Sequence, residues 1–193
     1  MEKSTLISEM HKFHFGNRIV CSDGEEGILT HLSFDAASRR AIGIGVKQGR
    51  FFGKSASLPF SHVVNASGEG VVLDVTRAEL FASEAKPEGI QYDGKSTVER
   101  ENAPGKGSLQ IVALHPKSGE LAYVVAHHLR SGQDTMLGEE YISRLEPDRI
   151  VVSLPDDVFQ ALSPYRSDSE LQQEVENIMF DVTSLHVDAK GMR

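Results

Sequence analysis

The sequence predicts a mainly β protein made of two small antiparallel β-barrels in tandem, with short helices and a helical C-terminal tail. Three observations support this fold class. The apolar residues stand in short runs rich in Val and Ile, separated by glycine, rather than in the long periodic stripes of a helical bundle. One pattern of apolar, turn and charged positions occurs twice along the chain. Each copy holds five or six short strands, which remove their edges and bury a core by closing into a barrel.

The repeat is clearest where residues 27–46 are set against residues 107–126, at an offset of 80 without a gap. Apolar positions then coincide, as for Leu32 and Val112, and both copies have a polar turn cluster at the same place. Deleting one residue gives an offset of 79, which continues the match to the last strand of each copy. We therefore expect two structurally equivalent units, each built from hairpins around these turns.

Changes in composition set the expected boundaries. Residues 14–82 form the first barrel domain and residues 95–162 the second. Residues 83–94 hold a proline, two glycines and mixed charge, which predicts a linker. Residues 163–193 form a tail of one helix and one strand.

Alternation along the expected strands predicts the core. The expected buried residues of the first unit are Ile19, Leu29, Leu32, Ile44, Leu58 and Val72. Those of the second unit are Leu109, Val112, Val124, Leu137 and Val151.

The tail carries its own helix signals. Asp168 is suited to cap a helix whose apolar stripe would consist of Leu171, Val175, Ile178 and Met179. A helix of about a dozen residues is marginal alone, so its stripe must be covered. We expect a homodimer with the tail at or near its interface, because the following strand at residues 185–189 would offer free edges to a second copy.

The first unit resembles the PRC-barrel family. The residues that carry the resemblance are the Asp23-Gly24 opening with Gly27, the turn from Asp35 to Arg40, and Leu58-Pro59 before the closing strand. The resemblance covers residues 14–80; the second unit has Leu137-Gly138 in place of Leu-Pro and resembles the family only through the repeat. It implies barrel modules that act as adaptors and carry no catalytic residue. The tail is similar to the opening of a BON domain, which would make it a fragment of a longer protein.

Charge and cysteine content exclude several classes. Lys and Arg total 20 against 28 Asp and Glu, a net charge of −8, whereas binding to duplex DNA needs an excess of cations. A single cysteine excludes an intramolecular disulfide and a cysteine-based zinc site. No apolar run suits a signal peptide or the ~18 residues of a membrane span, so we expect a soluble, cytoplasmic protein.

One basic and aromatic group stands out in the first unit. It consists of Arg39, Arg40, Lys47, Arg50, Phe51, Phe52 and Lys54. Such a group can bind single-stranded RNA by charge and stacking. The alternative is a solvated hairpin end, with one phenylalanine inside the barrel and one outside.

The remaining polar residues predict no metal, cofactor or catalytic site. His11 and His14 supply two ligands where zinc needs three or four, and the adjacent His127 and His128 of a strand should point to opposite faces. The loop that begins at Asp23 reads as a tight turn with Gly24 at positive φ. Cys21 reads as a small buried hydrophobe.

These observations favour a non-catalytic cytoplasmic adaptor or scaffold that binds a protein partner through barrel surfaces. The first alternative is an accessory of RNA processing or ribosome maturation that uses the basic group of the first unit. The second is a barrel that binds a small ligand.

Overall fold

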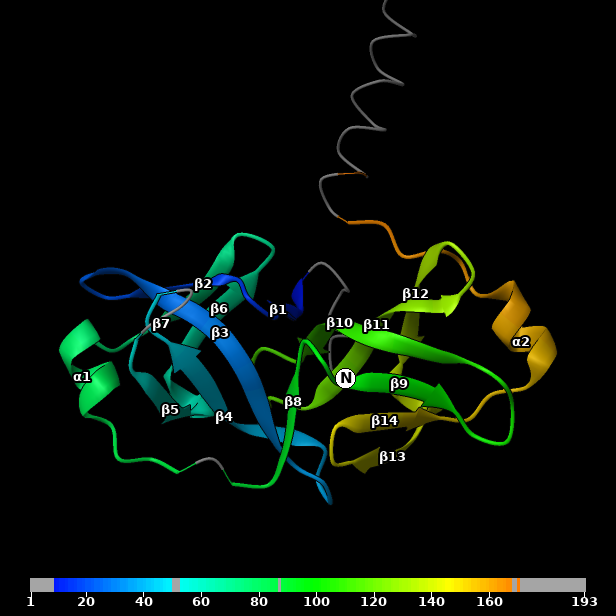
Figure 1. The fold of residues 1–193 in the computed structure, drawn as a ribbon, viewed down its shortest axis with the longest axis horizontal. Helices are drawn as coiled ribbons and strands as arrows, with labels where there is room; N and C mark the ends of the chain where they lie inside the picture. The colour runs from blue at the N-terminus through cyan, green and yellow to red at the C-terminus, as the bar shows by residue number, and fades with distance from the viewer. Residues whose placement is uncertain (1–8, 50–52, 87, 168–169, 171–193) are drawn as a thin grey trace, which may run out of the picture.

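The computed structural model describes residues 9–49, 53–86, 88–167 and 170 of the 193-residue chain. Over these residues the protein is mainly β, and its named helices are two short α-helices and two 3-10 helices (Figure 1). The elements of the first half are β1 (His11–His14), β2 (Arg18–Cys21), β3 (Gly24–Asp35), β4 (Arg40–Lys47), β5 (Ser55–Pro59), η2 (Phe60–His62), β6 (Val63–Ser67), β7 (Gly70–Leu73) and α1 (Arg77–Ala82). Those of the second half are β8 (Ile90–Asp93), β9 (Thr97–Arg100), β10 (Lys106–Leu114), β11 (Leu121–Arg130), β12 (Gln133–Gly138), η3 (Glu139–Tyr141), β13 (Ile142–Glu146), β14 (Arg149–Val152) and α2 (Asp156–Ala161).

Two curled sheets repeat the same strand order, as the sequence offset predicts. In the first repeat (β2 to α1) the order is β5-β4-β3-β2-β7-β6; in the second repeat (β9 to α2) it is β12-β11-β10-β9-β14-β13. In both, the first and last strands of the repeat pair in parallel, β2 with β7 and β9 with β14. The repeated order confirms the structural duplication that the sequence predicts.

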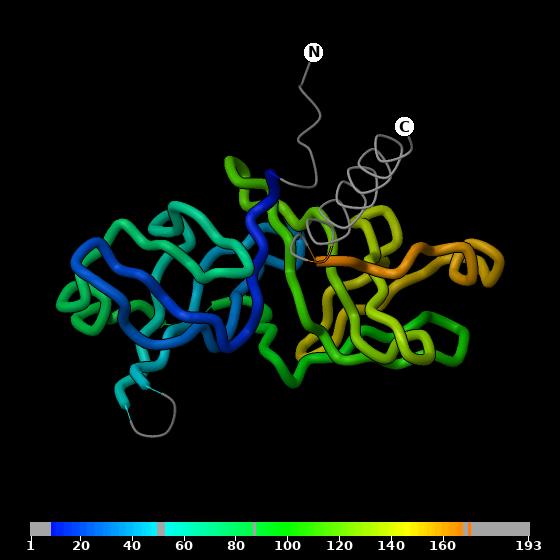
Figure 2. Tube along the Cα trace, turned by 90° about the horizontal axis from the view of Figure 1, so that it is seen from above, coloured from blue at the N-terminus to red at the C-terminus, as the bar shows by residue number. Residues whose placement is uncertain are grey.

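The strands that precede each repeat are exchanged between the sheets. Strand β1 precedes the first repeat in the chain but pairs with β10 of the second repeat. Strand β8 precedes the second repeat but pairs with β3 of the first. The registers are reciprocal: Phe13 is opposite Val112, and Tyr92 is opposite Leu32. Figure 1 shows both strands at the seam, and Figure 2 shows β1 running between the two lobes. Because residues 90–93 form β8, the expected linker at residues 83–94 contains a strand that joins the repeats.

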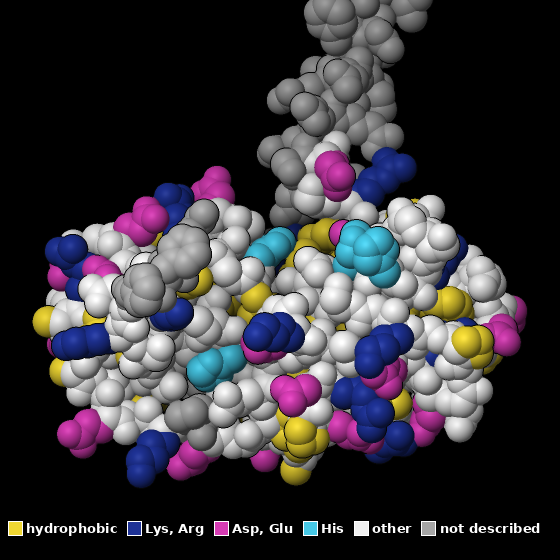
Figure 3. All heavy atoms as spheres, in the orientation of Figure 1, with side chains coloured by type: hydrophobic (Ala, Val, Ile, Leu, Met, Phe, Trp, Pro, Cys, Tyr) yellow, Lys and Arg dark blue, Asp and Glu magenta, His cyan; other side chains and the backbone are white. Residues whose placement is uncertain are grey.

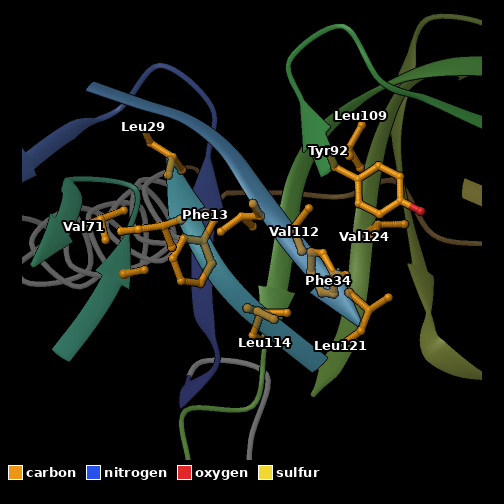
Figure 4. Packing of buried hydrophobic residues seen from close by; sticks show 14 of the residues in the cluster. Phe13, Leu29, Phe34, Val71, Tyr92, Leu109, Val112, Leu114, Leu121 and Val124 are labelled. Carbon is orange, nitrogen blue, oxygen red and sulfur yellow. The ribbon is translucent and has the colours of Figure 1, made fainter. Parts of the chain in front are cut away.

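The aromatic side chains of these exchanged strands enter one shared core. Phe13 packs against Phe60 of the first repeat, with ring centroids 5.8 Å apart. The Tyr92 hydroxyl donates to the backbone oxygen of Glu146 in the second repeat at 3.1 Å. Figure 4 shows Phe13 beside Leu29 and Val71, with Tyr92 among second-repeat residues. One contiguous cluster of buried hydrophobic residues therefore spans both repeats.

A second contact joins the β3–β4 and β10–β11 hairpins at equivalent positions. The Ala41 amide donates to the Gly119 oxygen, and the Leu121 amide donates to the Arg39 oxygen, both at 3.0 Å. Between these two bonds, Arg40 Nη2 lies 2.5 Å from Glu120 Oε1. The two bonds are related by the 80-residue offset, so a local twofold axis passes beside the Arg40–Glu120 pair.

The predicted core is buried at every position except Val72, which is half-buried. Its neighbours Val71 and Leu73 are the buried residues of this short strand, so the alternation was assigned to the wrong face. Strict alternation also fails in β3, where Leu29, Leu32 and Phe34 are all buried. The register shifts between Leu29 and His31, and at the equivalent place in β10. Residues after such a bulge point to the other face of the sheet than strict alternation predicts.

The expected short helices are present as α1 and α2, one after the closing strand of each repeat. Thr76 caps α1 in a reciprocal capping box with Glu79. The predicted tail helix and strand, including Asp168, Leu171, Val175, Ile178 and Met179, lie outside the described residues. Within the described part of the chain, no helix is long and apolar enough to cross a membrane.

Candidate functional site

The basic residues predicted to form one binding group lie at two ends of β4. Arg39 donates to the backbone oxygens of Glu139 and Ser143 in the second repeat, at 3.5 and 3.3 Å, and Arg40 pairs with Glu120. These two arginines therefore contact the other repeat. Arg39 has φ 55°, in the left-handed region, which fits the tight turn at this hairpin end.

Lys47 lies at the far end of β4, where it is paired in register with Ser55. Lys54 is close by, since its backbone oxygen accepts from the Gln48 amide at 2.8 Å. The length of β4 separates these lysines from the arginines by about 24 Å, at roughly 3.4 Å per residue. Arg50, Phe51 and Phe52 lie outside the described residues. The structure thus brings Lys47 and Lys54 together and places Arg39 and Arg40 elsewhere.

The histidines form no metal site in the described part of the chain, where no group of three or more His, Cys, Asp or Glu side chains is arranged to hold an ion. His11 and His14 lie at the two ends of strand β1. The expectation that His127 and His128 point to opposite faces is wrong. Their ring centroids are 3.7 Å apart, because His128 has φ 60° within an irregular stretch of β11 that breaks the alternation. His127 Nδ1 also contacts Asp134 Oδ1.

The Asp23 loop is a tight turn, as expected, with Gly24 at φ 139°. Asp23 accepts from the Arg77 amide at 2.9 Å, a bond that lowers the pKa of this carboxyl and fixes the loop to α1. Cys21 is buried, and burial raises the pKa of its thiol, so the group behaves as the small hydrophobe that the sequence predicts.

A groove of about 260 Å³ lies on the outer face of the first repeat, and sequence reasoning did not identify it. Ser33, Gly43 and Pro59 form its floor across three neighbouring strands, because their registers place them in one row. Ile42, Ser57 and Leu58 line its sides, and residues 85, 86 and 88 form its rim. The signal that could have found it is the Gly-x-Gly sequence in β4, which leaves two positions of this face without side chains.

The two glycines of β4 differ in what covers them. At Gly45 a Cβ atom would stand 2.0 Å from Cε1 of His31, so the imidazole ring already fills the space. Burial lowers the pKa of His31, which favours its neutral form. At Gly43 a Cβ atom would stand 3.1 Å from the Leu58 oxygen and 3.8 and 3.9 Å from Cβ and Oγ of Ser33, and no imidazole ring covers it. The open part of the groove is therefore the space over Gly43.

The second repeat fills the equivalent face with apolar side chains. Strand register makes Ala113, Tyr123 and Met136 the equivalents of Ser33, Gly43 and Ser57. These three side chains belong to a second hydrophobic cluster that also includes Met10, Ile111, Val125 and Tyr165. At these equivalent positions the two sheets thus differ: side chains pack together in the second repeat, and the first repeat has a groove.

Many charged side chains outside the groove form ion pairs with one another. Lysine, arginine and acidic side chains are interspersed over the face in Figure 3. Across β9, β10, β13 and β14 an alternating chain of ion pairs consists of Lys106, Glu99, Arg149, Glu146, Arg144 and Glu101. Hydrogen bonds from Lys106, Arg144 and Arg149 lower the pKa values of Glu99, Glu101 and Glu146, respectively. These six side chains of the second repeat are therefore paired with one another.

A scan against protein-family models finds no matching family, and a search of the curated proteins finds no matching relative.

Proposed function

We propose that the protein is a non-catalytic adaptor that docks a segment of a partner protein in the groove over Gly43. The observation that carries this proposal is the contrast between the repeats: the same face is packed by Tyr123 and Met136 in one and left open by Gly43 and Ser57 in the other. An apolar concavity with a few polar groups is the usual form of a recognition site.

We further propose that each curled sheet is a barrel-like module of the PRC type. The repeated strand order supports this, as does Gly24 at positive φ in the Asp-Gly opening. Leu58-Pro59 leads directly into η2, at the place where the family pattern has its Leu-Pro step.

A non-catalytic role is supported by the polar groups of the groove. Ser33 and Ser57 are its two hydroxyls, and neither hydroxyl hydrogen-bonds to a histidine or carboxylate among the described residues. A serine nucleophile needs an adjacent general base. The groove thus offers recognition chemistry without an activated nucleophile.

Site-specific photo-crosslinking tests the docking function. A benzophenone amino acid replaces Ile42, which lines the groove and is 38 % exposed; the matched control replaces Val64, which is 57 % exposed and does not line it. We expect one protein to crosslink from position 42 in cells that make this chain and not from position 64. The purified partner should then bind the wild type and lose affinity for Ser57→Met. Equal affinity for both would contradict groove docking.

The RNA-accessory alternative has less support from the geometry. Arg39 and Arg40 contact the second repeat, which leaves Lys47 and Lys54 as the described members that lie together. Two lysines supply a small part of the charge that a single-strand-binding surface needs.

A further inference from the structure

Building on the docking function above, we propose that the partner inserts a tyrosine side chain into the groove over Gly43 and that its phenol group hydrogen-bonds to the Ser33 hydroxyl. The partner is thus a protein with an exposed tyrosine, recognised by ring size and by one polar contact at the floor.

The second repeat shows which side chain this backbone accommodates at this place. Ser33 pairs with Gly43 in register, and Ala113 pairs with Tyr123 in the same way. The protein itself therefore places a tyrosine where the first repeat has an open floor. Tyr165 packs beside it, at the position equivalent to Lys86 on the groove rim.

The size of the groove fits one aromatic ring. Its volume is about 260 Å³, and an apolar cavity of about 150 Å³ already admits benzene. Ile42 supplies an apolar wall for the ring, and Pro59 an apolar part of the floor. Aromatic side chains bring a large contact area at a low cost in conformational freedom, which makes them frequent anchors of protein interfaces.

The Ser33 hydroxyl favours tyrosine over phenylalanine as the inserted side chain. This residue is 2 % exposed and lines the groove, yet its hydroxyl has no hydrogen-bond partner among the described residues. If an apolar ring covered this hydroxyl, the group would lose its contact with water and stay unsatisfied, which is costly. A phenol that donates to it, or accepts from it, removes that cost. The second repeat has Ala113 at this position, where the tyrosine is built in.

The test uses the full chain and three small probes: N-acetyl-tyrosine amide, N-acetyl-phenylalanine amide and N-acetyl-leucine amide. Each is titrated to about 10 mM while backbone amide NMR shifts are followed, since a ligand of this size is expected to bind with a dissociation constant of about 1 mM. Two variants take their residues from the second repeat. Ser33→Ala removes the hydroxyl, and Ser57→Met fills the groove. Ser55→Met, on the exposed end of the same strand, is the matched control.

We expect the tyrosine probe to shift the amides of residues 33, 43 and 57, and to bind about 2- to 12-fold more tightly than the phenylalanine probe, the range of one net hydrogen bond. Ser33→Ala should abolish that preference, and Ser57→Met should abolish binding, while Ser55→Met changes neither. The absence of shifts at the groove would overturn the proposal. So would a preference for the leucine probe, or a tyrosine preference that survives Ser33→Ala.

These failures are distinct from a failure of the docking function. If the crosslinked partner loses affinity for Ser57→Met but the tyrosine probe does not bind, the groove docks a protein through another group. If the probe binds but no partner depends on Ser57, the groove recognises a ring and the adaptor role is wrong.

Discussion

Replacing Phe13 with alanine tests whether the two repeats form one cooperative unit. The Phe13 side chain is fully buried, packs 5.8 Å from the Phe60 ring, and extends from a strand that is hydrogen-bonded to the other repeat. Its removal loses the transfer free energy of the ring and leaves a cavity, for a total of about 3–5 kcal/mol. In a chain of this size each kcal/mol lowers the melting temperature by about 2–4 °C. We therefore expect a decrease of roughly 6–20 °C.

Differential scanning calorimetry measures both the shift and the number of transitions. A shared core predicts that the wild type and Phe13→Ala each unfold in a single transition. Val64→Ala is the control: its side chain is 57 % exposed, so its free energy of unfolding should change by less than about 0.5 kcal/mol. Two resolved transitions, of which Phe13→Ala moves only one, would refute the shared core and make the repeats independent domains.

Four further predictions follow from the same structure. Leu32→Ala and Val112→Ala, at equivalent buried positions, should each lower the free energy of unfolding by about 1–5 kcal/mol in urea titrations, and unchanged midpoints for both would mean that the strand faces are misassigned. The folded-state pKa values of Glu99, Glu101 and Glu146 are lowered. The stability that their ionised forms contribute is therefore present above about pH 4.3 and is lost as the pH falls through the lowered values. Glu146→Gln should flatten the pH dependence of the melting temperature in that range. Light scattering should find a dimer for the intact chain and a monomer for a chain that ends at Leu162, whereas a monomeric intact chain rejects the proposed homodimer. Finally, the intact chain should bind duplex DNA no better than a neutral control protein at physiological salt, and a submicromolar, salt-sensitive affinity would contradict this.

The internal repeat made much of the fold predictable. Equivalent residues such as Leu29 and Leu109 are both buried, because the same strand order requires the same inward positions. Local alternation failed where the backbone departs from an ideal strand. The bulges near His31 and Ile111 change the face of the residues that follow, a second register shift comes after each of them, and no single residue type marks these places.

The exchanged strand β8 could not be predicted because its pairing is long-range. Residues 90–93 are few, lie between glycines and show little hydrophobicity, so local reasoning assigns them to a linker. They form a strand because they pair with β3 of the first repeat, while the buried Tyr92 side chain reaches Glu146 of the second repeat.

The groove could not be predicted for a related reason: it exists where Gly43 has no side chain, and its depth depends on residues of neighbouring strands. What Gly43 and Gly45 do depends on the strands beside them. One glycine accommodates His31, and the other leaves a hollow over Ser33. That difference appears only when β3, β4 and β5 are placed side by side.

The Arg40–Glu120 pair has a consequence for how such a molecule can be assembled. In a dimer of two identical chains, a residue beside the twofold axis faces its own copy, so an arginine there would meet an arginine and a glutamate would meet a glutamate. Both arrangements bring like charges together. Because both repeats lie in one chain, their sequences can differ, and the axis carries an attractive pair instead. A dimer of two copies of either repeat could not form this contact, because symmetry would place the same residue on both sides of the axis. Joining the two repeats in one chain allows opposite charges to meet there.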